Sequence, residues 1–274
     1  MRFLVGSPRS YTIRSVLNPL TGPNGVVDMT KAAAQHARLV ARLGGDSDVA
    51  TVDAGPDFPD GVFVANAGLF ICGIFIPARF HVRERRGEEE AVISWAAAAG
   101  YKVVRLPEEE GLYFEGDGDC ARSHGSRLWI GYGAGRTTLR GVEAVRRIVA
   151  PLGITVTPLH ISDRRTYHLD LCLCPLPNGR ALAHLGSFLP AGRTALRQAF
   201  GSALIDVPMK WLYGCNAVPV GRTLVVTRID PEWRAWISER AGMRVVDVNV
   251  GEFQKAGGGV ACLVLPLEDF SDTR

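Results

Sequence analysis

A helical run, a glycine and a strand-like run follow one another five times along this chain of 274 residues. Each helical run is amphipathic, and each strand-like run is rich in β-branched side chains. Glycine suits the left-handed residue that commonly ends a helix, so its position between the two runs indicates a boundary. The five segments are 37–53, 91–107, 144–160, 195–208 and 235–249, and their glycines are Gly44, Gly100, Gly153, Gly201 and Gly242.

More strand-like sequence lies between these segments and after the last of them, at 62–76, 127–133, 167–185, 216–226 and 260–267, with tight turns at 177–179 and 220–222. Five units of about 55 residues predict an array of ββαβ-type repeats around one shared core. The last unit lacks a return strand, and the N-terminal MRFLVG lacks a preceding helix. Pairing of these two ends would close a ring, so we expect an α/β fold in a single domain, 1–274.

Polar residues interrupt the apolar strands at comparable points of each unit. In a closed array such points converge on the central axis, where a thiol, an imidazole, carboxylates and amides would share one pocket. The residues concerned are Asp60, Asn66, Glu115, Asp119, His168, Asp170, Asn216 and Cys262.

Charge and hydropathy exclude two classes of protein. The net charge is only +3, and the densest basic cluster, Arg83 to Arg86, is followed by three glutamates, which is typical of a solvated helix start rather than a nucleic-acid surface. The uncharged stretch 61–78 contains Asn66, Pro77 and three glycines, so we expect two buried strands around a turn and no membrane span. Six cysteines, mostly in apolar runs, indicate the buried thiols of a cytoplasmic protein.

Cys262 follows three consecutive glycines, Gly257 to Gly259. A lone cysteine is usually a small core residue, but glycines let a ligand approach closely, so we interpret Cys262 as a nucleophile. His168 lies in YHLDLCLC, and in a strand it would share a face with Asp170, Cys172 and Cys174. That arrangement leaves zinc as an alternative, but proton transfer beside a thiol is the simpler interpretation. We expect no metal and no cofactor.

The segment FEGDGDC places Glu115, Asp117 and Asp119 among glycines. A solvated turn or a calcium loop is an alternative, but calcium ligands do not continue at alternate positions, so we expect a carboxylate that binds a cationic substrate. Arg136 in GYGAGRTT either holds a substrate carboxylate or caps the following helix. The residues leave these two roles open.

Six stretches in order, PDGVFVANAGL, FEGDGD, GYGAGRT, YHLDLCLCPL, GCNAV and EFQKAGGGVACLVL, resemble the pentein, or amidinotransferase-fold, enzymes that modify guanidines. Together with NPL at 18–20, the matches extend from residue 18 to about residue 265, so they cover nearly the whole chain. The resemblance is greatest to dimethylarginine dimethylaminohydrolases and to the arginine dihydrolase branch. It implies a five-bladed α/β propeller, in agreement with the five units counted above.

The resemblance implies that Cys262 is the nucleophile and that His168 transfers protons. It implies that Glu115 grips the guanidinium of the substrate. We assign Asp119 and Asp170 to substrate binding as well. The implied reaction is hydrolysis at the guanidino carbon of arginine or an Nω-methylated arginine through a covalent thiouronium on Cys262.

The rest of the implied site binds the amino-acid part of the substrate. Asp60 would take the α-amino group, Asn66 would help to hold the guanidinium, and Arg136 with Arg85 would hold the α-carboxylate. Arg79 competes with Arg85 for that position. The implied partner is a small guanidino molecule, with no nucleic acid and no membrane, and the sequence leaves a homo-oligomer open.

Three positions depart from the family pattern. Asn66 stands where dimethylargininases and arginine deiminases have aspartate, as in the arginine dihydrolase branch, Leu171 replaces the threonine of HLDT, and Ser15 stands where an acidic residue is common. The product is therefore either citrulline, as in dimethylargininases, or ornithine with ammonia, as in dihydrolases. An amidinotransferase, which passes the amidino group to an amine, is the alternative function.

Overall fold

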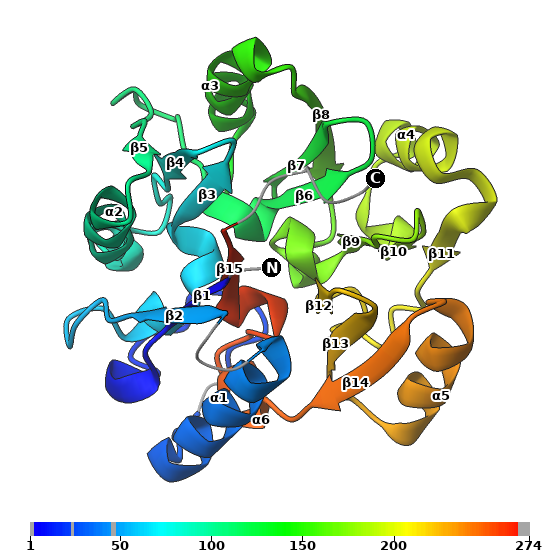
Figure 1. Ribbon diagram of the computed structural model, residues 1–274, viewed down its shortest axis with the longest axis horizontal. Coiled ribbons are helices and arrows are strands. Elements are labelled where there is room, and N and C mark those ends of the chain that lie inside the picture. The colour runs from blue at the N-terminus through cyan, green and yellow to red at the C-terminus, as the bar shows by residue number, and fades with distance from the viewer. Residues whose placement is uncertain (1–2, 23–24, 45–47, 268–274) are drawn as a thin grey trace.

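A computed structural model describes residues 3–22, 25–44 and 48–267. The strands within these residues form five three-stranded sheets that lie around a common centre, with the helices toward the outside (Figure 1). In every sheet the middle strand pairs antiparallel with one neighbour and parallel with the other. The α/β class and the five-unit organisation predicted from the sequence are therefore confirmed.

Four of the sheets are built from strands that are consecutive in the sequence. They are β3 (Gly68–Ile71), β4 (Ile74–Pro77) and β5 (Lys102–Val103); β6 (Cys120–Ser123), β7 (Arg127–Gly133) and β8 (Thr155–Ile161); β9 (Leu173–Pro175), β10 (Ala181–Ala183) and β11 (Leu204–Asp206); and β12 (Ala217–Val220), β13 (Thr223–Thr227) and β14 (Arg244–Val248). The turns predicted at 177–179 and 220–222 join antiparallel strands, and 61–78 contains the β3–β4 hairpin.

The fifth sheet combines two strands from the N-terminal part of the chain with one strand from the C-terminal part. It contains β15 (Val264–Pro266), β1 (Phe3–Gly6) and β2 (Val49–Val52), in that order. β15 runs antiparallel to β1, with Leu265 opposite Leu4. The pairing of the N-terminal and C-terminal strands predicted from the sequence is thus present, and both strands are almost completely buried.

A helix connects the middle strand of each sheet to its parallel neighbour, because parallel strands cannot be joined by a tight turn. These helices are α1 (Met29–Leu43), α2 (Glu89–Ala98), α3 (Leu139–Val149), α4 (Pro190–Phe200) and α5 (Pro231–Arg240), and a short α6 (Gly251–Gln254) follows β14. α3 shows how they pack: Val142, Val145 and Val149 lie on its buried face against Leu128 and Ile130 of β7.

The boundary glycines end their helices as predicted. All five have a positive φ, with values of 125° at Gly44, 87° at Gly100, 76° at Gly153, 53° at Gly201 and 65° at Gly242. A side chain at these angles would be strained, which explains why glycine recurs at this point of every unit.

Short 3₁₀ turns precede the first strand in four of the sheets, and they point toward the centre of the molecule. They are η3 (Val64–Ala67), η5 (Gly116–Asp119), η8 (Leu169–Leu171) and η11 (Ala261–Leu263). One expectation was wrong here: 167–172 is not a strand, and β9 begins only at Leu173. His168, Asp170, Cys172 and Cys174 therefore do not share one strand face, and the geometric argument for a zinc site is lost.

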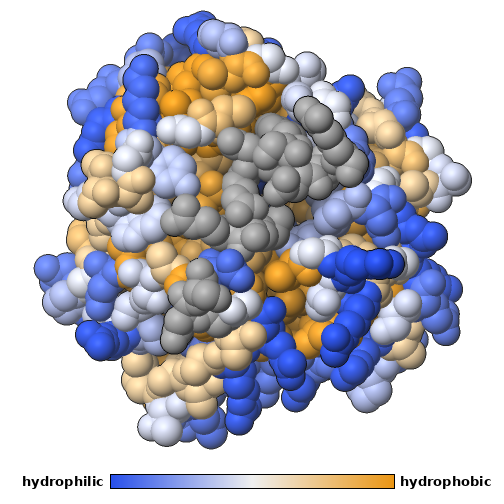
Figure 2. All heavy atoms as spheres, in the orientation of Figure 1, coloured by the Kyte–Doolittle hydropathy of each residue, from blue (hydrophilic) through white to orange (hydrophobic). Residues whose placement is uncertain are grey.

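On the face seen in Figure 2, hydrophilic residues predominate around the edge of the molecule, and hydrophobic side chains show between them. Within the described ranges, no helix is both long enough and apolar enough to cross a membrane.

Candidate active site

A small polar cavity of about 30 Å³ lies where the turns converge. Its walls carry charged, amide and thiol groups from widely separated segments of the chain. Its polar lining residues are Asn18, Asp60, Asn66, Arg85, Arg136, Tyr167, His168 and Cys262. Burial of so many polar groups in one place is costly unless they serve binding or chemistry, which makes this cavity the candidate site.

Cys262 is held between two polar side chains. Its thiol donates to Asp170 Oδ2 at 3.1 Å, and Asn216 Nδ2 donates to its sulfur at 3.3 Å. Burial, together with the charge of Asp170 and its hydrogen bond, raises the pKa of the Cys262 thiol well above its usual range. The thiol is therefore protonated at neutral pH, and it needs a nearby cation to become a thiolate.

The three glycines before Cys262 allow close packing of protein groups at this segment. A Cβ atom at Gly259 would collide with Asn216 Oδ1, and one at Gly258 would collide with the Phe63 ring. Gly257 has a φ of 90°, which a side chain rarely adopts. The glycines thus let protein groups pack against the segment, where Gly258 also lines the cavity, and Asn216 Oδ1 accepts from Ala261 N at 2.8 Å.

His168 lies against a buried ion pair. Its Nε2 is 2.9 Å from Glu115 Oε2, and Arg136 Nη1 donates to the same oxygen at 3.0 Å. Glu115 is fully buried, and burial alone would raise its pKa, but the Arg136 guanidinium and the His168 hydrogen bond lower the pKa to about 2. The carboxylate is therefore ionised, and it orients His168 through Nε2, which leaves Nδ1 as the ring nitrogen that does not contact Glu115.

A second buried carboxylate supports this group from behind. Thr137 Oγ1 donates to Asp119 Oδ2 at 2.6 Å and accepts from Glu115 N at 3.0 Å. Leu169 N donates to Asp119 Oδ1 at 3.1 Å. Asp119 does not line the cavity. Its two hydrogen bonds connect the segment that carries Thr137 to the turn that begins at Leu169, directly after His168. Burial raises its pKa to about 6.

The remaining predicted residues that line the cavity are Arg85, Asn66 and Asp60. Arg85 is buried: Nε and Nη2 donate to Glu88, and Nη1 donates to Asn66 Oδ1 at 2.9 Å. The sequence suggested that the basic cluster around Arg85 is a solvated helix start. The burial of Arg85 shows that it is not fully solvated. Asp60 shares the cavity, and its burial raises its pKa although two guanidiniums oppose this. Arg79 lies outside the cavity and donates to carbonyl oxygens of Leu112 and Glu109.

The structure thus brings most of the predicted residues together around one cavity, although not all of them line it. Cys262, His168, Asp60, Asn66, Arg85 and Arg136 line the cavity, Glu115 and Asp119 lie behind it, and Asp170 faces it only through the thiol. Sequence analysis gave no role to Asn216, although it was among the converging residues. It missed Thr137 and Tyr167 entirely, and only their adjacency to Arg136 and His168 could have indicated them. Tyr167 donates to Gly257 O at 2.9 Å and lies 5.2 Å from the Arg136 guanidinium.

No arrangement of three or more histidine, cysteine, aspartate or glutamate side chains within the described residues is suited to hold a metal ion.

Comparisons with known proteins address the identity of such a site. The chain is 32% identical to the N(G),N(G)-dimethylarginine dimethylaminohydrolase of Mycobacterium tuberculosis, over 97% of this chain and 85% of that protein. It is 33% identical to the bifunctional arginine dihydrolase/ornithine cyclodeaminase AgrE of Nostoc sp., over 98% of this chain. The chain belongs to the pentein family of dimethylarginine dimethylaminohydrolases and arginine dihydrolases.

A solved structure supports the same family assignment. The N-terminal domain of ArgZ, a cyanobacterial arginine dihydrolase whose crystal structure holds substrate in a cysteine-to-serine variant, superimposes with a TM-score of 0.88, at 30% identity and with 98% of each chain covered. The present chain spans only 38% of the length of the bifunctional relative AgrE. No protein-family model matches the chain.

Proposed function

We propose that this pentein is a cysteine-dependent hydrolase that acts at the guanidino carbon of arginine or of an Nω-methylated arginine. The observation that carries the proposal is the convergence in one polar cavity of the Cys262 thiol, the His168 imidazole and two guanidiniums, Arg85 and Arg136. A thiol and an imidazole can perform covalent catalysis, and guanidiniums can bind the carboxylate of an amino acid.

The amino-acid part of the substrate occupies the wall opposite the thiol. Asp60 binds the α-amino group. Arg136 takes the α-carboxylate, because its Nη2 donates to a backbone carbonyl, that of Leu17, at 2.7 Å, while Glu115 holds its Nη1. Arg85 assists, although Glu88 already neutralises most of its charge.

The guanidinium lies beside Asn66 and Asp170 rather than Glu115, since Glu115 is already bonded to the Arg136 guanidinium and to the His168 ring. Its positive charge provides the cation that the Cys262 thiol needs. The thiol gives its proton to His168, the thiolate attacks the guanidino carbon, the C–N bond breaks, and His168 passes that proton to the departing amine. A covalent thiouronium remains on Cys262. His168 then takes a proton from water, the water adds to the carbon, and the C–S bond breaks.

Asn66 favours the dihydrolase outcome. An uncharged side chain tolerates the neutral ureido group of a first product better than a carboxylate would, so a second hydrolysis can release ornithine, another ammonia and the ureido carbon as carbon dioxide. The dimethylargininase outcome, with citrulline and a methylamine as products, is the second candidate, and both agree with the named relatives. An amidinotransferase remains the alternative; nothing in the cavity specifically favours it.

We also propose that the five sheets are the blades of a closed ring and that 1–274 is one catalytic domain. The β15–β1 pairing supports both statements, because it joins the two terminal strands in one sheet.

Incubation with arginine, monomethylarginine and asymmetric dimethylarginine, each followed by mass spectrometry of the products, tests the function. Ornithine with ammonia from arginine establishes a dihydrolase, and citrulline with methylamines establishes a dimethylargininase. A Cys262→Ser variant is the control and should bind these compounds without turnover. Equal turnover by that variant, or amidino transfer to an added amine in place of hydrolysis, would overturn the proposal.

A further inference from the structure

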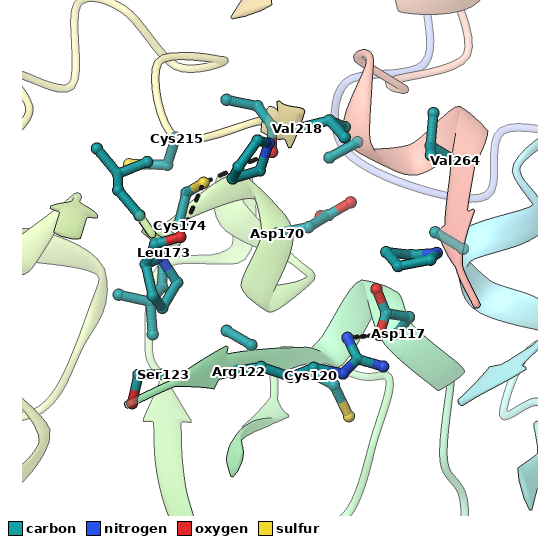
Figure 3. Close-up of a pocket in the computed structure, with 18 of the residues that line it drawn as sticks. Asp117, Cys120, Arg122, Ser123, Asp170, Leu173, Cys174, Cys215, Val218 and Val264 are labelled. Carbon is teal, nitrogen blue, oxygen red and sulfur yellow. Dashed lines mark hydrogen bonds and ion pairs between the residues drawn. The ribbon is translucent and has the colours of Figure 1, made fainter. Parts of the chain in front are cut away.

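A second, larger cavity of about 210 Å³ lies near the centre of the molecule, beyond Asp170 (Figure 3). Segments from four sheets form its walls, β6, β9, β12 and β15. Its side chains are mainly apolar, such as Leu173, Val218 and Val264. Its charged pair, Asp117 and Arg122, is joined by an ion pair of 2.6 Å. We call it the rear cavity, and the catalytic one the front cavity.

The two cavities are separated by the thickness of about one residue. Asn66 lines the front cavity, and its neighbour Ala65 lines the rear one. Cys262 lines the front cavity, and its neighbour Ala261 lines the rear one. Three separate segments show this alternation, the third being the turn that carries His168 at the front and Asp170 at the rear.

Asp170 is the polar contact between the two sides. Its Oδ2 accepts from the Cys262 thiol, and its Oδ1 has no hydrogen-bond partner among the described residues although the atom is buried. Figure 3 shows its side chain in the middle of the rear cavity, with Asp117 and Arg122 on one side and Val218 on the other. An unpartnered carboxylate oxygen in an apolar enclosure is a site for a small N–H donor.

The front cavity cannot serve every step of the proposed reaction. At about 30 Å³ it is smaller than an arginine molecule, so it must widen to admit the substrate and offers no free space beside it. While the thiouronium is attached to Cys262, the amino-acid part still occupies the front. The amine must nevertheless leave before water can attack the same carbon, so it needs another route.

We propose that the leaving amine departs through the rear cavity, past Asp170. This inference rests on the proposed function. When the C–N bond breaks, the nitrogen keeps the bonding electrons and takes its proton from His168, and Asp170 Oδ1 then accepts a hydrogen bond from the neutral amine. The apolar walls suit the methyl groups of a mono- or dimethylamine. The rear cavity is thus a binding site for small primary and secondary amines.

Narrowing this route tests the proposal. Val218→Phe adds bulk to the rear cavity, and Val220→Phe makes the same change two residues further along β12, where the side chain does not line it. The substrate series is arginine, monomethylarginine and asymmetric dimethylarginine, whose departing amines increase in size. Single-turnover reactions followed over time give the rate of amine release. Binding of each substrate to each variant in a Cys262→Ser background gives the substrate Kd.

Val218→Phe should leave the Kd unchanged and slow amine release increasingly along the series, by about tenfold for each added methyl group, the lower end of what one such group is worth in an apolar pocket. Val220→Phe should behave as the parent does. Equal slowing for all three amines, or no slowing, would overturn the rear route while leaving the hydrolase intact. Failure of the proposed function is distinguishable, because the parent itself would then release no amine. If Val218→Phe does not fold, Ser123→Trp, at a partly exposed position of the same cavity, provides the same comparison.

Discussion

Glu115 and Asp170 are both buried carboxylates close to the candidate catalytic groups, yet their surroundings differ completely. Glu115 meets the Arg136 guanidinium and the His168 ring, and its pKa falls to about 2. Asp170 meets a thiol and no cation, and burial with the nearby charge of Asp117 raises its pKa to about 7, against the effect of the thiol hydrogen bond. Burial disfavours both charges equally, so their partners decide which carboxylate is ionised.

The contrast separates a structural charge from a functional one. Glu115 completes its interactions within the protein and has no need of a ligand. Asp170 lacks a positive partner, and a substrate guanidinium would supply one. The same cation would lower the pKa of Cys262, so binding and activation of the nucleophile become one event.

The largest expected effect is on stability. Glu115→Gln leaves Arg136 buried without its carboxylate, and the free energy of unfolding should fall by about 3 to 5 kcal/mol, the usual result of breaking a buried ion pair from one side. Asp170→Asn removes a carboxyl that has no cationic partner among the described residues and is only about half ionised at pH 7, so its effect should be much smaller. Urea denaturation at pH 7 measures both. A larger loss in Asp170→Asn than in Glu115→Gln would contradict the comparison.

The pH dependence of stability should have opposite signs for the two groups. The pKa of Glu115 is lowered from 4.5 to about 2, so its contribution is present above pH 4.5 and is lost as the pH falls toward 2. The pKa of Asp170 is raised from 3.8 to about 7, so its contribution is present below pH 3.8 and is lost as the pH rises to 7. The difference in unfolding free energy between the parent and each amide variant, measured as a function of pH, gives the two slopes. Slopes of the same sign would refute the assignment.

Thiol reactivity should respond to Asp170 and not to Glu115. Asp170→Asn removes the neighbouring charge that helps to raise the pKa of Cys262, and iodoacetamide should then alkylate the thiol at pH 8 faster, by about tenfold for each unit of pKa lost. Cys72, the exposed cysteine, is replaced by serine in every variant to isolate the signal. Glu115→Gln is the matched control, and a comparable acceleration there would show that the effect is not local to Asp170.

The sequence predicts features that depend on neighbouring residues, and it does not predict contacts between residues far apart in the chain. The glycine after each helix is a local signal, and it identified all five units. The polar residues that reach the centre could be selected because each one interrupts an apolar run. Their partners could not be assigned, because Cys262 meets Asp170 across 92 residues and His168 meets Glu115 across 53. Hence the sequence could not show that Glu115 is bonded to His168 and Arg136, and Asn216 received no role.

The smallest expected effect concerns Asp119, which lies between the two extremes. It has neutral donors, the Thr137 hydroxyl and the Leu169 amide, and burial raises its pKa to about 6. Asp119→Asn keeps one accepting oxygen and loses the other, so unfolding should become easier by only about 1 kcal/mol, the value of one neutral hydrogen bond. Because Leu169 follows His168, the same change should reduce kcat more than it raises the KM for arginine. Thr137→Val, which removes the matching donor, should give a similar pair of values, and a loss as large as that of Glu115→Gln would show that Asp119 carries a full charge in the folded protein.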